Sequence, residues 1–398
     1  MKIRVFCVPI LCFFLVWSFD LTAQENRSTI PAKAKWSERM ALSIMKTYPK
    51  AWQIDHHEAP KWDYKIGMIL TAYEKLYSTT ANQKYLNYIS EYADAFIDDS
   101  GTFQNFDAND HNIDFINAGK ILFGLYDTTH QQKYLRALKI VRKQFDSHPR
   151  TPSGGFWHKK IYPNQMWLDG LYMGQPFYAR YTTTFENGMQ LNDVAYQFEL
   201  LHDHTLDSTT GLFFHAYDES RQMPWANKKT GTAPHIWLRA LGWYGMALVD
   251  VLDYFPIDHP KRKVLINYLN ELTIAVKQYQ DPSGLWYQIP NLPNGKGNYL
   301  EASGSAMLVY AIAKGVHKGY LPNQFENVAL KGFDGLLSKL IQVDQEGLVH
   351  ITQVCKSAGL GGNPYRDGSY DYYMSEKVVT DNSHGLGAFL LAAIELNK

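Results

Sequence analysis

A single acidic side chain, Asp169, stands inside the apolar segment from 165 to 174, between Leu168 and Gly170. Removing a carboxylate from water disfavours its charged form, so burial there would raise the pKa of Asp169. A carboxyl group with a raised pKa can donate a proton near neutral pH, as a general acid must. Because Asp is also a favoured N-cap residue, the same position is typical of a helix start. Both a catalytic and a structural role are therefore open for Asp169.

Further polar and aromatic residues with binding chemistry stand where apolar, helix-like segments are expected to begin. These candidates are Trp62, Asp63, His111, Asp114, Trp167, His235, Trp237, Arg239, Glu301, Ser303, Asn382 and His384. Two more histidines, His158 and His215, follow Gly-aromatic turns. An arginine and several histidines among carboxylates favour a ligand that is itself an acid, held by charge-assisted hydrogen bonds. A flat sugar ring would stack on Trp167 or Trp237.

Each of these residues also has a purely structural interpretation. His158 could be solvated on a turn, and His215 could be a core histidine with its hydrogen bonds satisfied. Arg239 on a buried helix could merely pair with an acid, and Asp114 could be that acid. The histidines lack the spacing of a zinc-binding His-Glu-x-x-His motif, so no metal site is predicted.

The elements that would position these residues follow an internal repeat. A glycine followed by aromatic or apolar residues recurs every 54–73 residues, and polar turn residues precede most copies. The copies begin at Gly101, Gly155, Gly211, Gly284 and Gly347.

Two kinds of helix are predicted around these turns. Segments that are apolar on nearly all sides are typical of buried helices, and they cover 64–77, 112–126, 168–181, 236–254, 302–316 and 383–396. Segments with apolar residues at i, i+3, i+4 and i+7 are typical of amphipathic helices, and they cover 36–48, 82–96, 133–145, 191–201, 261–279 and 324–340.

Six inner and six outer helices in alternation predict an all-α fold, an (α/α)6 barrel, with the candidate residues at one mouth. An open helical solenoid is the alternative, but its repeats should resemble one another more closely. No Ser/Gly linker or charge run divides the chain. We therefore expect a single barrel domain over residues 25–398.

Charge and targeting signals limit the partners and the compartment. Formal net charge is +0, without a basic block, so nucleic acid and anionic membrane surfaces are not expected partners. Lys2 and Arg4 precede an apolar run that ends at Phe19, and this predicts a cleavable signal peptide over residues 1–24. The run is too short to span a bilayer comfortably. We expect an exported, soluble protein, periplasmic or secreted, and a monomer.

One part of the chain resembles a known enzyme signature. Trp157-His158, Tyr162-Pro163 and the run from Gln165 to Met173 are similar to the motif of the unsaturated glycuronyl hydrolases, most closely glycoside hydrolase family 105. Further matches are 111–120, 211–218 and 237–243. Family 88, the unsaturated glucuronyl hydrolases, is the related family with the same barrel. The resemblance covers nearly the whole chain after residue 24.

The resemblance implies a hydrolase that removes a 4,5-unsaturated uronate from the non-reducing end of oligosaccharides left by polysaccharide lyases. Asp169 would protonate C4 and accept a proton from the water that adds at C5. The hemiketal formed would open and expel the neighbouring sugar. Asp114 would be a second acid whose charge helps to keep Asp169 protonated. No metal or organic cofactor is implied.

The remaining site residues also follow from the resemblance. His158, Trp167, His215, Trp237 and Arg239 match ligand-contacting positions. His111, Met173 and Trp243 lie in the matching segments and complete the expected substrate-binding set.

Other functions stay open at this point. The unsaturated sugar could be galacturonate linked to rhamnose, which we favour, or glucuronate from ulvan, arabinogalactan or glycosaminoglycan lyase products. A polysaccharide lyase on the same barrel, a non-catalytic sugar-binding protein and an inverting glycosidase are the further alternatives. The aglycone contacts are expected on the loops 218–234 and 358–373.

Overall fold

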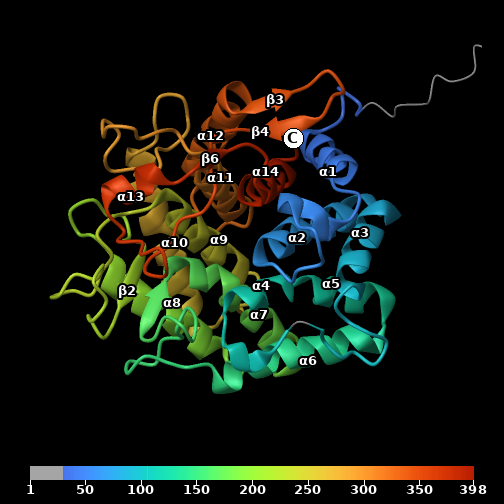
Figure 1. Cartoon of the computed structure of the whole chain (residues 1–398), viewed down its shortest axis with the longest axis horizontal. Helices are drawn as coiled ribbons and strands as arrows, with labels where there is room; N and C mark the ends of the chain where they lie inside the picture. The colour runs from blue at the N-terminus through green and yellow to red at the C-terminus, as the bar shows by residue number, and fades with distance from the viewer. Residues whose placement is uncertain (1–29, 105) are drawn as a thin grey trace, which may run out of the picture.

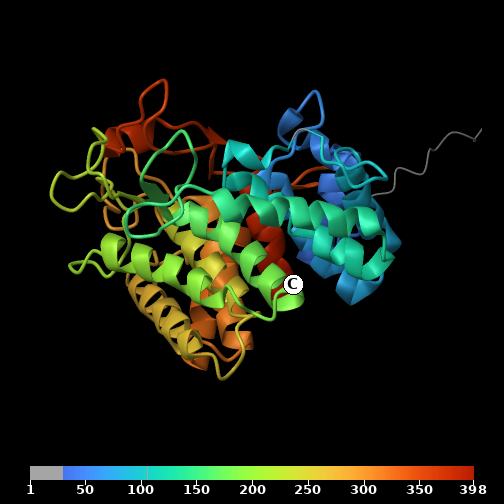
Figure 2. The same cartoon turned by 90° about the horizontal axis from the view of Figure 1, so that it is seen from below.

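The computed structural model describes residues 30–104 and 106–398, so the predicted signal peptide lies outside the described residues. Figure 1 shows a mostly helical molecule in which an inner ring of helices is surrounded by an outer ring. Figure 2 shows the same two layers turned by 90°. Among the described residues, no helix is both long and apolar enough to cross a membrane.

The inner ring closes on itself. Its members are α2 (Tyr64–Thr80), α4 (Asp114–Ala118) with α5 (Ile121–Thr129), α7 (Leu168–Phe185), α9 (Leu238–Val251), α11 (Ala302–His317) and α14 (Ser383–Glu395). Helix α2 packs against α4, α4 against α7, α7 against α9, α9 against α11, α11 against α14, and α14 returns to α2. The predicted (α/α)6 barrel is therefore confirmed, and the open solenoid is excluded.

The outer ring covers each inner helix with one partner. It consists of α1 (Trp36–Thr47), α3 (Gln83–Asp94), α6 (Gln132–Ser147), α8 (Leu191–Thr205), α10 (Pro260–Gln278) and α12 (Glu326–Lys339). In this order they pack on α14, α2, α5, α7, α9 and α11. The outer helices are amphipathic, as α3 illustrates by burying Tyr85, Tyr88, Ile89 and Tyr92.

The inner helices approach one another closely at small residues. A Cβ atom on Gly67 of α2 would lie 2.4 Å from the Cα atom of Ala118 in α4, which no side chain can occupy. A Cβ atom on Gly304 of α11 would lie 3.0 Å from the backbone nitrogen of Arg239 in α9. Close packing of this kind holds the first turns of the inner helices together at one end of the barrel.

The sequence predicts one continuous inner helix over 112–126. In the structure this helix is broken into α4 and α5. The amides of Gly119, Lys120 and Leu122 bond to carbonyls three residues earlier, which tightens the backbone there. Gly119 is also packed against the side chains of Val141 and Phe177, where a Cβ atom would have little room. Lys120 stands at this break and is 5% exposed.

The remaining elements are short and lie in the connections. Three antiparallel ribbons pair β1 (Gln165–Trp167) with β2 (Ala216–Asp218), β3 (Ile341–Val343) with β4 (Val349–Ile351), and β5 (Val354–Cys355) with β6 (Val378–Val379). Short helices are η1 (Ala51–His56), η2 (Ala108–Asp110), η3 (Asn323–Phe325) and α13 (Tyr370–Ser375).

Candidate active site

A cleft of about 670 Å³ opens at the end of the barrel where the inner helices begin. Its walls come from η1, the first turns of α2, α4 and α14, the loop before β1, and the loops next to β5 and β6. The lining residues used below are Asp55, Asp63, Tyr64, Lys65, Asp114, His158, Lys159, Tyr162, Trp167, Lys356, Arg366 and His384.

Asp169 lies beside His215 because two short strands pair in register. Trp167 of β1 is opposite Ala216 of β2, and α7 begins directly after Trp167. The Asp169 Oδ2 atom is 3.2 Å from His215 Nε2, and the Asp169 side chain is 14% exposed. Among the described residues, neither atom has a hydrogen-bond partner of good geometry. His215 is fully buried, and its Nδ1 atom lies 2.7 Å from the Tyr373 hydroxyl.

The pKa of Asp169 is lowered rather than raised. Burial acts to raise it, but the neighbouring His215 and, more weakly, His158 favour the carboxylate and outweigh that effect. The predicted upward shift in the pKa of Asp169 is therefore wrong for the free protein. The pKa is lowered by His215, which stands 46 positions later in the chain, so the residues around Asp169 could not reveal this effect.

Asp114 is held more firmly than Asp169. Its Oδ2 atom is 2.6 Å from Lys159 Nζ, and its Oδ1 atom is 3.3 Å from His158 Nε2. Burial lowers the pKa of His158 to about 4, so its imidazole is neutral at pH 7. Lys159 balances the Asp114 charge, which weakens the repulsion expected to keep Asp169 protonated. Sequence reasoning missed Lys159, because a lysine on a turn is ordinarily a surface residue.

Trp167 supports the histidine side of the cleft. His158 stacks on its ring at 4.5 Å with an interplanar angle of 8°, and Tyr162 stacks at 5.2 Å. The indole nitrogen donates to Gln165 Oε1. Gly170 leaves room for this arrangement, because a Cβ atom there would lie 3.0 Å from His158 Nδ1. Trp167 thus lines the cleft and also fixes the orientation of His158.

Trp237 and Arg239 lie behind the cleft rather than in its lining, and each is 1% exposed. Arg239 donates from Nη1 to Ser303 Oγ and to the Cys355 carbonyl at 3.1 and 2.6 Å. The Trp237 ring lies 4.8 Å from His215. Among the described residues Arg239 forms no ion pair with Asp114, so that structural interpretation is wrong.

Three other candidates are placed away from the cleft lining. His111 Nε2 contacts Ser147 Oγ at 3.0 Å on the α6 side. Met173 and Trp243 are 1% exposed core residues of α7 and α9. Trp243 stacks on Tyr172 at 4.9 Å and meets the rings of Tyr64 and His384, which do line the cleft.

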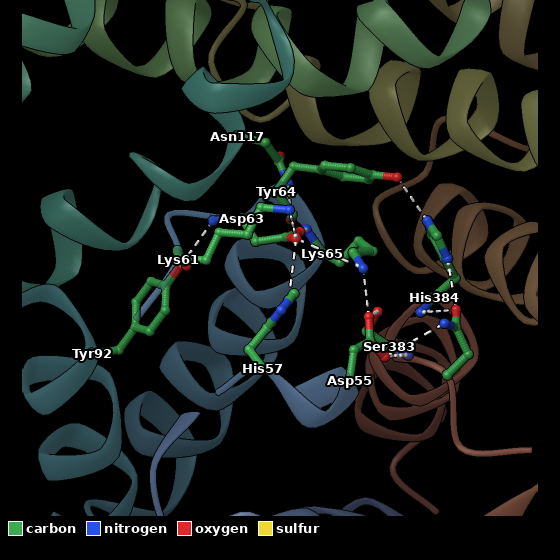
Figure 3. Close-up of polar contacts among 11 residues, drawn as sticks. Asp55, His57, Lys61, Asp63, Tyr64, Lys65, Tyr92, Asn117, Ser383 and His384 are labelled. Atoms are coloured by element: carbon green, nitrogen blue, oxygen red, sulfur yellow. Dashed lines mark hydrogen bonds and ion pairs between the residues drawn. The ribbon is translucent and has the colours of Figure 1, made fainter. Parts of the chain in front are cut away.

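Figure 3 shows a polar network in the wall of the cleft formed by η1 and the first turns of α2 and α14. The network joins α2 to α14. Asp55 accepts hydrogen bonds from the Ser383 amide and hydroxyl and pairs with Lys65. Tyr64 Oη lies 2.9 Å from His384 Nε2, and His384 Nδ1 lies 2.7 Å from Asn382 Oδ1. Since an amide oxygen only accepts, His384 carries its proton on Nδ1 and accepts from Tyr64.

Part of this wall could be predicted from the sequence. Asp63, Asn382 and His384 stand at expected helix starts, and Asp63 indeed caps α2 by accepting from the Lys65 amide at 2.8 Å. Asp55 had no such signal. It lies in η1 with a left-handed φ of 61°, in a segment without apolar periodicity.

The third wall comes from the segment after β5. Arg366 donates to the Tyr162 hydroxyl at 2.9 Å and to the Gly361 carbonyl, and Lys356 lies nearby in the lining. Together with Lys61, Lys65 and Lys159 they place five basic side chains around the cleft, against four aspartates. Such a surface suits an anionic ligand. Among the described residues, no group of three or more His, Cys, Asp or Glu could hold a metal ion.

An all-α barrel with two carboxylates near a basic cleft defines a hydrolase site of the glycosidase type. Residues 36–398 match the family model described as Glycosyl Hydrolase Family 88, and the chain belongs to this family. The resemblance stated from the motifs is confirmed, and the protein is an enzyme of this glycoside hydrolase group.

Individual relatives narrow the comparison. A solved glycoside hydrolase from family 105 of C. acetobutylicum ATCC 824 is 43% identical, with a TM-score of 0.88 over 92% of this chain and 99% of that one. The unsaturated rhamnogalacturonyl hydrolase YesR of Bacillus subtilis (strain 168) is 26% identical over 281 residues, which are 69% of this chain and 76% of YesR. The unsaturated glucuronyl hydrolase of Bacillus sp. GL1, at 13% identity, covers 91% of this chain and 95% of its own with a TM-score of 0.64, and shares the fold.

Proposed function

We propose that this enzyme removes a 4,5-unsaturated uronic acid, galacturonate in origin and linked to rhamnose, from the non-reducing end of lyase-generated oligosaccharides. The observation that carries the proposal is the Asp169 carboxylate, which is partly exposed beside a basic cleft and has an oxygen without a hydrogen-bond partner among the described residues. The similarity to YesR, whose name states a rhamnogalacturonyl substrate, supports the choice of sugar.

The reaction is a hydration of the C4=C5 double bond. Asp169, in its acid form, donates a proton to C4, and the positive charge that develops is shared between C5 and the ring oxygen. Water adds to C5 and loses a proton to the Asp169 carboxylate, which restores the acid. The hemiketal at C5 then opens, and the anomeric carbon becomes an aldehyde as the neighbouring sugar leaves. The usual spacing rule for two glycosidase carboxylates does not apply to this scheme.

Asp169 can act as an acid only if substrate binding raises its pKa. In the free enzyme, His215 outweighs the effect of burial and keeps the pKa of Asp169 low. A bound uronate brings a second negative charge close to Asp169 and excludes water, and both changes disfavour the Asp169 carboxylate. Protonation of Asp169 is therefore coupled to binding of an acidic sugar, which also selects against neutral substrates.

The other cleft residues hold the substrate and the acid in place. Lys159 and Lys65 line the cleft and would pair with the substrate carboxylate. The neutral imidazole of His158 and the acceptor Asp114 would form hydrogen bonds with sugar hydroxyls. Arg239 is a positioning residue, because it fixes the Cys355 carbonyl and Ser303 behind the cleft. Arg366, in the loop 358–373, lines the cleft and would contact the aglycone.

The test is a panel of oligosaccharides produced by different lyases. We expect fast loss of the double-bond absorbance with rhamnogalacturonan lyase products and slow loss with glucuronyl products from ulvan, arabinogalactan or glycosaminoglycans. Turnover of glucuronyl products alone would replace the galacturonate assignment. New double bonds formed on intact pectin would identify a lyase instead. In heavy-oxygen water, the label belongs on C5 of the opened uronate, and label on the anomeric carbon would mean ordinary glycoside hydrolysis.

We also propose that residues 1–24 direct export and are then removed, which leaves a soluble monomer whose single catalytic domain is 25–398. The basic, apolar and small-residue regions of that segment support it. Mass spectrometry of the exported protein should give a mature start near Gln24 or Glu25. An intact Met1 in that fraction would contradict the proposal, and light scattering would report the oligomeric state.

A further inference from the structure

A second cavity, of about 160 Å³, lies at the end of the barrel opposite the cleft. Helix α2 defines the two ends, because its first turn lines the cleft, whereas Glu74 and Lys75, about three turns further on, line this cavity. The later parts of α7, α9 and α11 supply Arg180, Asp250 and Lys314 to its wall. The mechanism proposed above uses none of these side chains.

Every acid in the cavity wall already has a basic partner. Glu74 pairs with Arg180 at 3.2 Å. Lys314 is almost fully buried and bridges Asp250 and Asp253 at 2.7 and 2.6 Å. These ion pairs link α2 to α7 and α9 to α11, and they use all the negative side chains that line the cavity.

Two lysines in the wall have no such partner. The Lys120 ammonium group is buried, and among the described residues it has no hydrogen-bond partner. It lies 3.8 Å from the centre of the Tyr172 ring. Within the same described set, Lys75 forms no ion pair within 4.0 Å. Its ammonium group lies 5.9 Å from the centre of the Tyr310 ring. An ammonium group left in this way is costly, because an aromatic face replaces little of its hydration.

Burial and neighbouring cations lower the pKa values of both lysines. The pKa of Lys120 is lowered to about 7, mainly by burial and also by Lys314 and Lys75, although Asp250 and Glu74 act to raise it. Burial also lowers the pKa of Lys75, with Lys314 again adding to the effect. The wall carries four basic and three acidic side chains, so one positive charge is uncompensated when both lysines are protonated.

We propose that this cavity binds a small inorganic oxyanion, of the size of sulfate or phosphate, between the ammonium groups of Lys75 and Lys120. Its volume accommodates such an ion with one or two waters, and the unpartnered donor Lys120 points into it. The bound anion would join α2 to the start of α5 beneath the Tyr172 ring. The inference is independent of the substrate of the cleft, because no residue of the cavity also lines the cleft.

The test uses the full chain and sulfate itself. In a buffer of large organic anions, sodium sulfate added at constant ionic strength should raise Tm by about 2–4 °C, because a ligand that binds the folded state stabilises it. Binding requires protonated Lys120, so the rise should be larger at pH 6 than at pH 8. Crystals soaked in selenate should show an anomalous peak within hydrogen-bond distance of both Lys75 and Lys120 Nζ atoms.

Variants decide between a built site and a general salt effect. Lys120→Met keeps the length of the side chain without its charge, and it should weaken sulfate binding at least tenfold and abolish the Tm rise. Lys263→Met, on the exposed face of α10, should leave the rise unchanged. An equal rise in wild type and Lys120→Met, or selenate crystals with water alone in the cavity, would overturn the proposal. If Lys120→Met does not fold, Lys75→Met and the selenate crystals of the wild type decide.

Discussion

Asp114 lines the cleft and Asp169 lies beside it; each carboxylate faces a histidine from a distant part of the chain, yet the two surroundings differ. Asp114 has a lysine ammonium group at 2.6 Å and an imidazole at 3.3 Å, so both of its oxygens are engaged. Among the described residues, the Asp169 Oδ2 atom meets the His215 ring at 3.2 Å without hydrogen-bond geometry, and that oxygen is buried. Asp114 is therefore held as a charge-balanced acceptor, whereas within the same described residues Asp169 has no ammonium partner.

This difference explains why one cleft can use two acids for two purposes. Because the Lys159 ammonium group balances its charge, Asp114 is held in place as a hydrogen-bond acceptor. Asp169 has a lone imidazole partner, so a new negative charge nearby changes its protonation readily. The comparison predicts that mutations around Asp169 alter chemistry, whereas mutations around Asp114 mainly alter geometry.

The largest effect is expected for Asp169→Asn. The amide is nearly isosteric and cannot donate to C4 or accept the proton of water, so we expect kcat to fall by about 10⁴-fold or more. Following the double-bond absorbance with a lyase product measures this loss. Asp146→Asn, at an exposed acid of α6, is the matched control and should stay within twofold of wild type. A fully active Asp169→Asn enzyme would remove Asp169 from the chemistry.

A smaller loss is expected for Lys159→Met. It leaves the Asp114 charge without its ammonium partner, and losing a charged hydrogen bond costs about 1.5–3 kcal/mol, which is roughly 10–100-fold in kcat/KM. The neighbouring Lys160→Met is exposed and should have little effect. Asp114→Asn in the Lys159→Met background should cost less than it does alone, because the two changes break the same pair. Additive losses would show that the pair does not act as a unit.

The pH dependence of kcat/KM and of kcat should report the pKa of Asp169 in the free enzyme and in the substrate complex, respectively. The acid must be protonated to react, so activity falls as pH rises through its pKa. Because the pKa is lowered in the free enzyme, kcat/KM should decline at lower pH than kcat, which reports the substrate complex. We expect the two alkaline limbs to differ by about one pH unit, which corresponds to about 1.4 kcal/mol. Coincident limbs would mean that substrate does not change the ionisation of Asp169.

The smallest effect is expected at the third wall. Arg366→Met loses the contact with the Tyr162 hydroxyl in the cleft lining. We expect KM to rise by up to about tenfold with long substrates, while kcat stays within twofold, because rim contacts bind without entering the transition state. Lys263→Met, on the exposed face of α10, is the control. A matching fall in kcat would place Arg366 in the chemistry instead.

The barrel could be predicted because each helix carries its own signal. Segments such as 302–316 are apolar all round and must be buried, while neighbours such as 82–96 show one apolar face. The break at Gly119 could not be predicted, because it depends on how closely Val141 and Phe177 pack there. Lys120 lies within the segment 112–126, whose burial the sequence predicts, and it is 5% exposed.

The site was predictable where a residue stands at the start of a helix or after a Gly-aromatic turn. Asp114, Trp167 and Asp169 were found from helix starts, since inner helices all begin at one mouth, and His158 was found from such a turn. Lys159 and Asp55 were missed because they lie on connections, and their importance comes from partners far along the chain. The direction of the Asp169 pKa shift has the same origin, because it depends on a strand pairing that brings His215 across.

The bonds from Asp55 to Ser383 have a consequence for the order in which the molecule assembles. These two residues are 328 positions apart, and their contact closes the ring between α2 and α14. A chain leaving the ribosome can stack its hairpins in succession, but this wall of the cleft cannot exist until residue 383 has emerged. The enzyme therefore gains this wall of its cleft only after α14 has been synthesised, and until then the exposed flank of α2 is an apolar surface that a chaperone could cover.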